Sequence, residues 1–144
     1  MLDRVDDTIV AISSPAGASV RGVIRLSGKR AFELADHVFA ADSGLSLTSS
    51  GGYRRLFGQI RSAALAGLPA EVYLFRAPAS YTRQDVVELH TIGSPPVLAE
   101  LCDSLMVKGA RQAEPGEFTA RAFLAGAMDL TRVEGVAAMI HASN

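Results

Sequence analysis

The sequence has few of the residues that form metal sites and disulfides, and it has no excess of the basic residues that bind phosphate groups. Cys102 is its only cysteine, which excludes an internal disulfide and a cysteine-based metal site. His37, His90 and His141 show no metal-ligand spacing, so we expect each to be a surface or core histidine and no metal to be bound. Fourteen basic and fifteen acidic residues leave a net charge of −1. This balance argues against a module that holds nucleic acid mainly through its phosphates.

Long hydrophobic runs are also missing. No stretch approaches the ~20 apolar residues that span a bilayer. Aspartates near the start make the first residues unlike a signal peptide, so we expect a cytoplasmic protein. Cys102 lies at helical spacing from Leu98, Leu101 and Leu105, which predicts a buried and unreactive thiol.

Catalytic signatures are absent as well. No nucleophile–base motif is present. The stretch from Gly22 to Arg30 is the nearest approach to a phosphate loop, but that motif needs four residues between its glycines and a Ser or Thr after the lysine. Here five residues intervene, and Arg30 follows Lys29. We therefore expect no catalytic residue in this chain and no binding or hydrolysis of GTP.

What the chain does contain is enough hydrophobic sequence for one domain. A chain of 144 residues, of which 49% are hydrophobic, buries roughly 68–70% of its unfolded surface. Apolar and alternating runs predict strands at residues 8–13, 20–27, 53–60, 71–75 and 85–92. Helical spacing predicts helices at residues 31–39, 95–108 and after Gly116. The expected class is α/β (α+β), a mixed sheet of about five strands with helices packed on it.

A last helix is expected near the end of the chain. Leu130, Val133, Val136 and Ile140 recur at helical spacing, and this amphipathic pattern continues to Asn144. We therefore expect residues 1–144 to form a single domain that continues into a longer protein.

Two charged residues stand inside expected strands. Arg25 lies on one face of the second strand, with Val20 and Ile24 on the other, and Glu88 shares a face with His90 in the fifth. A carboxylate among apolar neighbours is costly unless it is paired. Glu88 and Arg25 either point to solvent, pair across neighbouring strands, or line a pocket for a flat heterocycle rich in donors, such as a pterin ring.

Four stretches resemble a known family: DTIVAISSPAG, GVIRLSG, SYTRQDVVELH and AEPGEFTARAFLAGAMDL. The last is close to the pattern AEPGEFTxRAFxNGKxDL of the N-terminal domain of the MnmE/TrmE tRNA-modification GTPases. The resemblance covers nearly the whole chain.

The resemblance implies a fold like the tetrahydrofolate-binding module of aminomethyltransferases, binding of a formyl-tetrahydrofolate, and a homodimer. By this resemblance, the folate contacts of the family would fall on Arg25 and Glu88. A third would fall on the position of Ala127, where the family has a lysine. In the whole protein, a helical domain and a GTPase domain that uses GTP, Mg and K would follow. With the flavoprotein MnmG (GidA), that enzyme would modify the wobble uridine of certain tRNAs, with no membrane involved.

Departures from the family pattern leave three functions open. Ala127 replaces the lysine, Ala125 replaces an asparagine, and the family stretch TGED reads Thr82–Arg83–Gln84–Asp85. The first hypothesis is a folate-binding and dimerising domain of a tRNA-modification GTPase. The second is a structural dimerisation domain whose folate pocket has decayed, and the third is a folate-dependent protein like the aminomethyltransferases.

Overall fold

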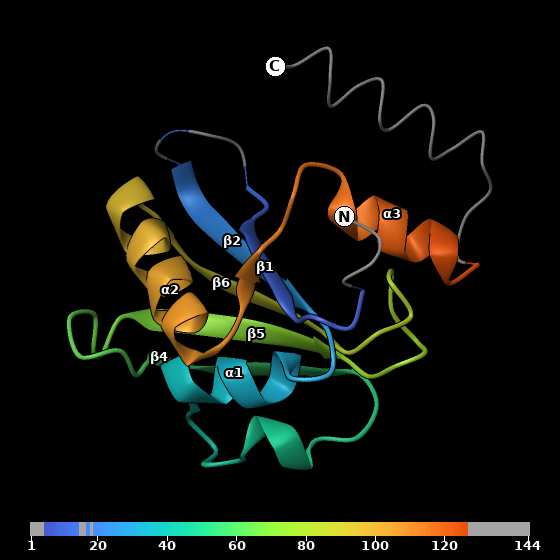
Figure 1. Ribbon diagram of the computed structural model, residues 1–144. Coiled ribbons are helices and arrows are strands. Elements are labelled where there is room, and N and C mark those ends of the chain that lie inside the picture. The colour runs from blue at the N-terminus through green and yellow to red at the C-terminus, as the bar shows by residue number, and fades with distance from the viewer. Residues whose placement is uncertain (1–4, 15–16, 18, 127–144) are drawn as a thin grey trace.

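The computed structural model describes residues 5–14, 17 and 19–126, which form one mixed sheet with helices packed on it (Figure 1). The sheet has seven strands in the order β3-β4-β5-β6-β2-β1-β7. Neighbouring strands are antiparallel except β1 and β7, which are parallel. The strands are β1 (Ile9–Ile12), β2 (Ser19–Ser27), β3 (Phe39–Ala41), β4 (Arg54–Ile60), β5 (Pro69–Phe75), β6 (Val86–Gly93) and β7 (Arg111–Gln112).

The mixed α/β class and the five expected strands are confirmed, but the strand count was too low. The two additional strands, β3 and β7, have three and two residues and form the sheet edges. Phe39 was expected in a helix, yet its backbone is extended and it pairs with Ile60. Strands this short carry no readable alternation, so pairing with a longer neighbour decides their conformation.

The described helices are α1 (Ala31–Val38), α2 (Pro95–Lys108) and α3 (Glu117–Leu124), with a single 3₁₀ turn η2 (Leu47–Ser49). Two prolines occupy the first turn of α2, where their missing N–H groups cost nothing. Gly109 ends this helix with φ 128°, a value that favours glycine. No helix within the described ranges is both long and apolar enough to cross a membrane.

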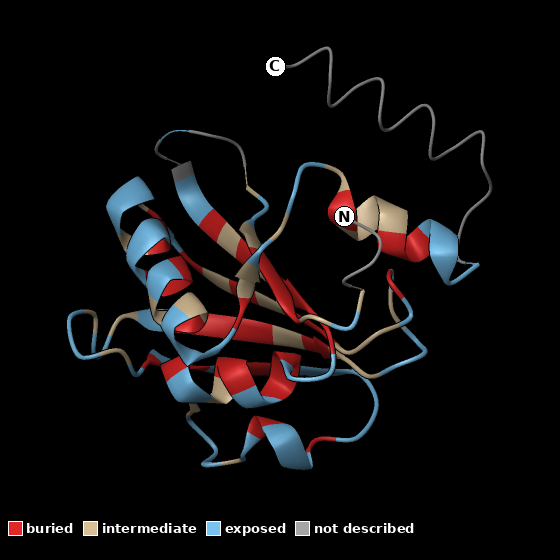
Figure 2. Ribbon diagram, viewed as in Figure 1, coloured by how far each residue is buried: buried red, intermediate tan, exposed pale blue. Residues whose placement is uncertain are grey.

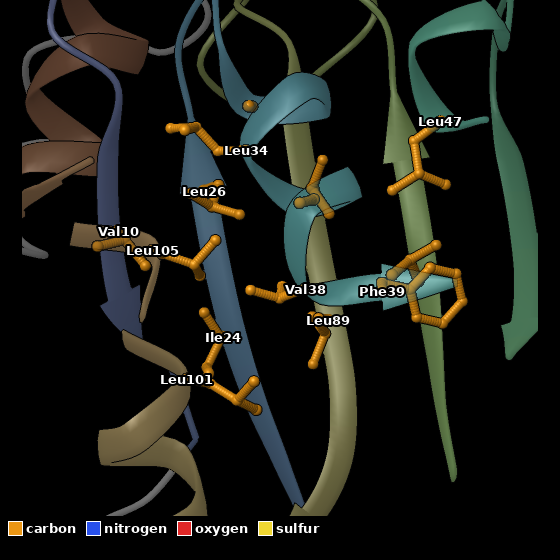
Figure 3. Close-up of a cluster of buried hydrophobic side chains, with 14 of the residues drawn as sticks. Val10, Ile24, Leu26, Leu34, Val38, Phe39, Leu47, Leu89, Leu101 and Leu105 are labelled. Carbon is orange, nitrogen blue, oxygen red and sulfur yellow. The ribbon is translucent and has the colours of Figure 1, made fainter. Parts of the chain in front are cut away.

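Helices α1 and α2 cover one face of the sheet and enclose the core (Figures 1 and 2). Ile24 and Leu26 of β2 lie beside Leu101 and Leu105 of α2, and Leu89 of β6 lies beside Val38 of α1 (Figure 3). The isoleucine and the four leucines are fully buried. Truncating one such leucine to alanine costs about 2–5 kcal/mol. Cys102 is buried beside them, and this burial raises the pKa of its thiol to about 11, so the expectation of a buried thiol is confirmed.

Two glycines allow close approach in this layer. A Cβ on Gly22 would lie 2.6 Å from Cδ1 of Leu98, so glycine lets α2 pack tightly on β2. Gly28 follows β2 with φ 143°, and a Cβ there would lie 2.6 Å from the Cα of Thr8. The Thr8 hydroxyl accepts a hydrogen bond from the backbone N–H of Arg30 at 3.0 Å. The close approach of Thr8 therefore explains why a glycine precedes α1, and no phosphate-binding role is needed to explain it.

The expected facing of Val20 was wrong. Ser19 pairs with Gly93 and Arg21 with Ile92, so Val20 is an extra residue in β2, a β-bulge. Its side chain is 97% exposed instead of sharing the core face with Ile24. The expected helix at residues 130–140 lies outside the described residues, as does Ala127.

Candidate functional site

Arg25 and Glu88 face each other on the sheet face opposite α1 and α2. They are direct cross-strand partners of β2 and β6, although 63 residues separate them in the sequence. Nη2 of Arg25 donates to Oε2 of Glu88 at 2.9 Å, and Nε donates to the same oxygen at 3.3 Å. Their side chains are 32% and 23% exposed. Of the alternatives left open by the sequence, cross-strand pairing is therefore observed.

The same pair lines a cavity of about 520 Å³, within the size range of small-molecule sites. The remaining wall residues are mostly aromatic or small, namely Phe75, Tyr81, Val86, Gly116, Phe118 and Thr119. The Arg25 guanidinium lies 5.8 Å from the centre of the Phe118 ring, a cation–π distance. The cavity thus combines a charged pair with flat apolar surfaces.

Two segments close the cavity over the sheet. Tyr81 comes from residues 76–85, which connect β5 and β6, and its hydroxyl lies 3.1 Å from that of Thr119 on α3. Asp85 holds the connection, because its carboxylate accepts from Nη1 of Arg76 at 2.9 Å and from the backbone N–H of Ala77 at 2.9 Å. Ser27 lies 2.7 Å from the hydroxyl of Thr82 and donates to Gln84 at 2.8 Å.

A buried carboxylate fixes the start of α3. Glu117 is 1% exposed and accepts from Nη2 of Arg111 at 2.7 Å, from Nη2 of Arg121 at 3.1 Å and from the backbone N–H of Glu114 at 3.0 Å. Burial alone would raise the pKa of Glu117, but the hydrogen bonds from Arg111 and Glu114 outweigh it and the pKa is lowered. The carboxylate therefore stays ionised and holds Phe118 and Thr119 at the cavity wall.

A second hollow, of about 300 Å³, lies on the same sheet face and is lined by Arg21, Phe57, Glu71, His90 and Ile92 among others. Glu71 is 6% exposed at its side chain and accepts from Arg21 at 2.6 Å, from Arg55 at 3.0 Å and from the Tyr73 hydroxyl at 3.1 Å. Burial opposes ionisation of Glu71, yet the hydrogen bonds from Arg21 and Arg55 lower its pKa.

Sequence reasoning found the charged pair but missed most of the cavity wall. Phe75, Tyr81, Phe118 and Thr119 were not singled out. Tyr81, Phe118 and Thr119 lie inside the family-like stretches SYTRQDVVELH and AEPGEFTARAF. The resemblance therefore covered these residues, but it assigned no function to them. Within the described ranges, no group of three or more histidine, cysteine or acidic side chains could hold a metal ion.

Comparison with known proteins gives a consistent match. The family model described as GTP-binding protein TrmE N-terminus matches residues 8–127. A protein named tRNA modification GTPase MnmE from Chlorobium phaeovibrioides is 40% identical over 140 residues, which cover 94% of this chain and 29% of the relative. The protein of that name from Streptococcus suis is 41% identical over 144 residues, which cover 99% of this chain and 31% of the relative. The chain thus spans about three tenths of the length of these curated relatives.

Proposed function

Because the chain belongs to the family of MnmE/TrmE N-terminal domains, we propose that it is the folate-binding and dimerising part of a tRNA-modification GTPase. The Arg25–Glu88 pair inside an aromatic cavity carries the folate part of the proposal. The relatives described above are named tRNA modification GTPases, which favours this function over an aminomethyltransferase-like activity.

The cavity suits the pterin of a formyl-tetrahydrofolate in shape and polarity. Phe75, Tyr81 and Phe118 offer flat apolar surface for a fused ring. Glu88 offers carboxylate oxygens to the paired N–H groups of an amino-pyrimidinone. Arg25, which also lines the cavity, supplies donors for an acyl oxygen or a carboxylate of the ligand.

Binding of a pterin would change the hydrogen bonds of Glu88. A carboxylate has about four lone-pair sites. Three are engaged, two by Arg25 at Oε2 and one by His90 at Oε1. Two parallel bonds from a pterin therefore require Arg25 to give up its longer contact, the 3.3 Å one from Nε. This release would also free part of the guanidinium for the ligand.

Titration calorimetry with formyl-tetrahydrofolate tests the proposal. Glu88→Gln keeps the side-chain shape but replaces an acceptor by a donor, so it should weaken binding by roughly 1–3 kcal/mol. Glu33→Gln, on α1 at the opposite face, is the matched control and should bind as the wild type does. Ala127→Lys restores the family residue type and should strengthen binding.

The outcomes separate the two remaining functions. Saturable binding that Glu88→Gln weakens and Glu33→Gln does not supports the folate site. A wild type without heat at millimolar ligand, which Ala127→Lys fails to rescue, rejects it. The remaining hypothesis is then that the chain serves only as a structural dimerisation domain.

For the whole protein, we propose the activity that the relatives' name describes, tRNA modification by a GTPase. GTP, Mg and K would be bound by a separate GTPase domain, and tRNA and an MnmG/GidA-like flavoprotein would be its partners in the cytoplasm. This domain would contribute the one-carbon donor and the dimer contact.

A further inference from the structure

His90 lies between the two hollows of the uncovered sheet face. It belongs to β6, two residues beyond Glu88, and its side chain is 14% exposed. Its Nε2 lies 3.2 Å from Oε1 of Glu88, and its Nδ1 lies 3.2 Å from Nη1 of Arg21. The ring packs on Tyr73 of β5 with centroids 4.7 Å apart. Contacts from three strands therefore hold this imidazole in one orientation.

These contacts fix which ring nitrogen carries the proton. A guanidinium N–H can only donate, so Nδ1 facing Arg21 must accept. The proton of the neutral ring is then on Nε2, which donates to Glu88. Arg21 is itself held by the buried Glu71 at 2.6 Å, which anchors the arrangement from the far side.

We propose that His90 is a positioning residue for Glu88 in the ligand cavity, acting through its Nε2–H. The inference rests on the proposed folate site. Arg25 binds only Oε2, so without His90 the carboxylate could rotate about its last torsion, which has a broad energy profile. A donor on Oε1 fixes the carboxylate plane. It thereby holds in place for the pterin the free acceptor site on Oε1 and the site on Oε2 that Arg25 would release.

The chain of contacts also gives Glu71 and Arg21 a role at a distance. A series of contacts runs from the second hollow to the ligand cavity. Each residue contacts the next in the order Glu71, Arg21, His90, Glu88 and Arg25. Arg21 sets the tautomer of His90, and the tautomer sets the donor that Glu88 receives. The second hollow thus supports the first without contacting the ligand.

Two amide variants separate positioning from packing. In His90→Gln the amide nitrogen reaches the position of Nε2 and can still donate to Glu88. In His90→Asn the shorter amide reaches the position of Nδ1, so it can accept from Arg21 but not donate to Glu88. Calorimetry with formyl-tetrahydrofolate should give near-wild-type affinity for His90→Gln and about tenfold weaker binding for His90→Asn. The control is His37→Asn, on the exposed side of α1, which should bind as the wild type does.

Two results would overturn the inference. One is equal loss of affinity in His90→Gln and His90→Asn, which is the result expected from lost packing alone. The other is wild-type affinity in His90→Asn.

A ligand-free measurement keeps the inference separate from the proposed function. Nitrogen-15 NMR of the imidazole should show the Nε2–H tautomer at neutral pH, and Arg21→Met should increase the Nδ1–H population. A dominant Nδ1–H form in the wild type contradicts the positioning contact whether or not folate binds. Absence of folate binding with the Nε2–H tautomer present rejects the folate function and leaves the His90–Glu88 contact supported.

Discussion

Glu117 and Arg121, one turn apart on α3, form a buried ion pair of 3.1 Å whose side chains are 1% and 2% exposed. Removing one partner of a buried pair leaves the other charge uncompensated. Glu117→Gln should therefore lower the free energy of unfolding by about 3 kcal/mol. Urea denaturation measures this, with Glu33→Gln as a control for an exposed pair. Equal stability of Glu117→Gln and wild type would show that the pair contributes nothing net.

The same carboxylate predicts a loss of stability in acid. The pKa of Glu117 is lowered in the folded state from its ordinary value of 4.5, so the folded state favours the ionised form. Its contribution is therefore complete above pH 4.5 and is lost as the pH falls below 4.5 through the folded pKa. Between pH 6 and pH 3, stability of the wild type should fall more steeply than that of Glu117→Gln. Parallel curves would contradict this assignment.

Arg83 predicts a stabilising substitution. It is the non-glycine residue with a positive φ, 64°, in the described chain, and it stands where the family pattern TGED has glycine. The left-handed conformation costs about 1–2 kcal/mol for such a residue, and glycine removes this cost. Glycine also increases the entropy of the unfolded chain, which lowers the stability by about 0.5–1 kcal/mol. Arg83→Gly should raise the free energy of unfolding by about 0.5–1 kcal/mol. Arg61→Gly, at an exposed position without positive φ, should lower it instead.

Gly28 predicts a strongly destabilising substitution. An alanine there combines φ 143° with a clash against the backbone of Thr8. Gly44 also has a positive φ, 79°, but a Cβ on it would meet no atom within 4 Å. Gly28→Ala should cost about 3 kcal/mol or more, and Gly44→Ala about 1–2 kcal/mol. Thermal denaturation of the two variants compares them directly, and similar midpoints would show that the contact with Thr8 is easily relieved.

We expect the proposed dimer to form through the sheet face that α1 and α2 leave uncovered. Phe57 and Ile92 are 58% and 52% exposed on the sheet face that α1 and α2 leave uncovered. The short edge strands β3 and β7 offer little to pair with. At micromolar concentration, sedimentation equilibrium should give about twice 15.1 kDa, and the double change Phe57→Asp, Ile92→Asp should give the monomer mass. Val107→Asp, an exposed apolar position on α2, should leave the dimer intact.

The sequence was most informative where periodicity is strong. Alternation placed Arg25 on the face of β2 opposite Ile24, and it placed Glu88 and His90 together on one face of β6. Both placements agree with the structure. It could not reveal that β2 and β6 are neighbours, because strand order depends on contacts between residues far apart in the chain. The pairing of Arg25 with Glu88 therefore needed the fold.

The cavity wall was hidden for a similar reason. Phe118 and Thr119 line the same cavity as Glu88 in part because Glu117 is held by Arg111. Arg111 in turn binds Asp7, 104 residues away, at 2.9 Å. Side-chain networks of this kind leave no periodic trace in a sequence. The bulge at Val20 is equally silent, because one extra residue looks like ordinary alternation until the partner strand is known.

The walls of the ligand cavity come from β2, β5, β6, α3 and residues 76–85, so the cavity exists only when distant segments are assembled. An unfolded chain offers nothing comparable. By mass action, a molecule that fills this cavity acts as a clamp on the folded state. At a hundred times its Kd it would add about 2.7 kcal/mol to the free energy of unfolding. The melting temperature would then rise with the ligand concentration, so the thermal stability of this domain would depend on how much of that ligand is present.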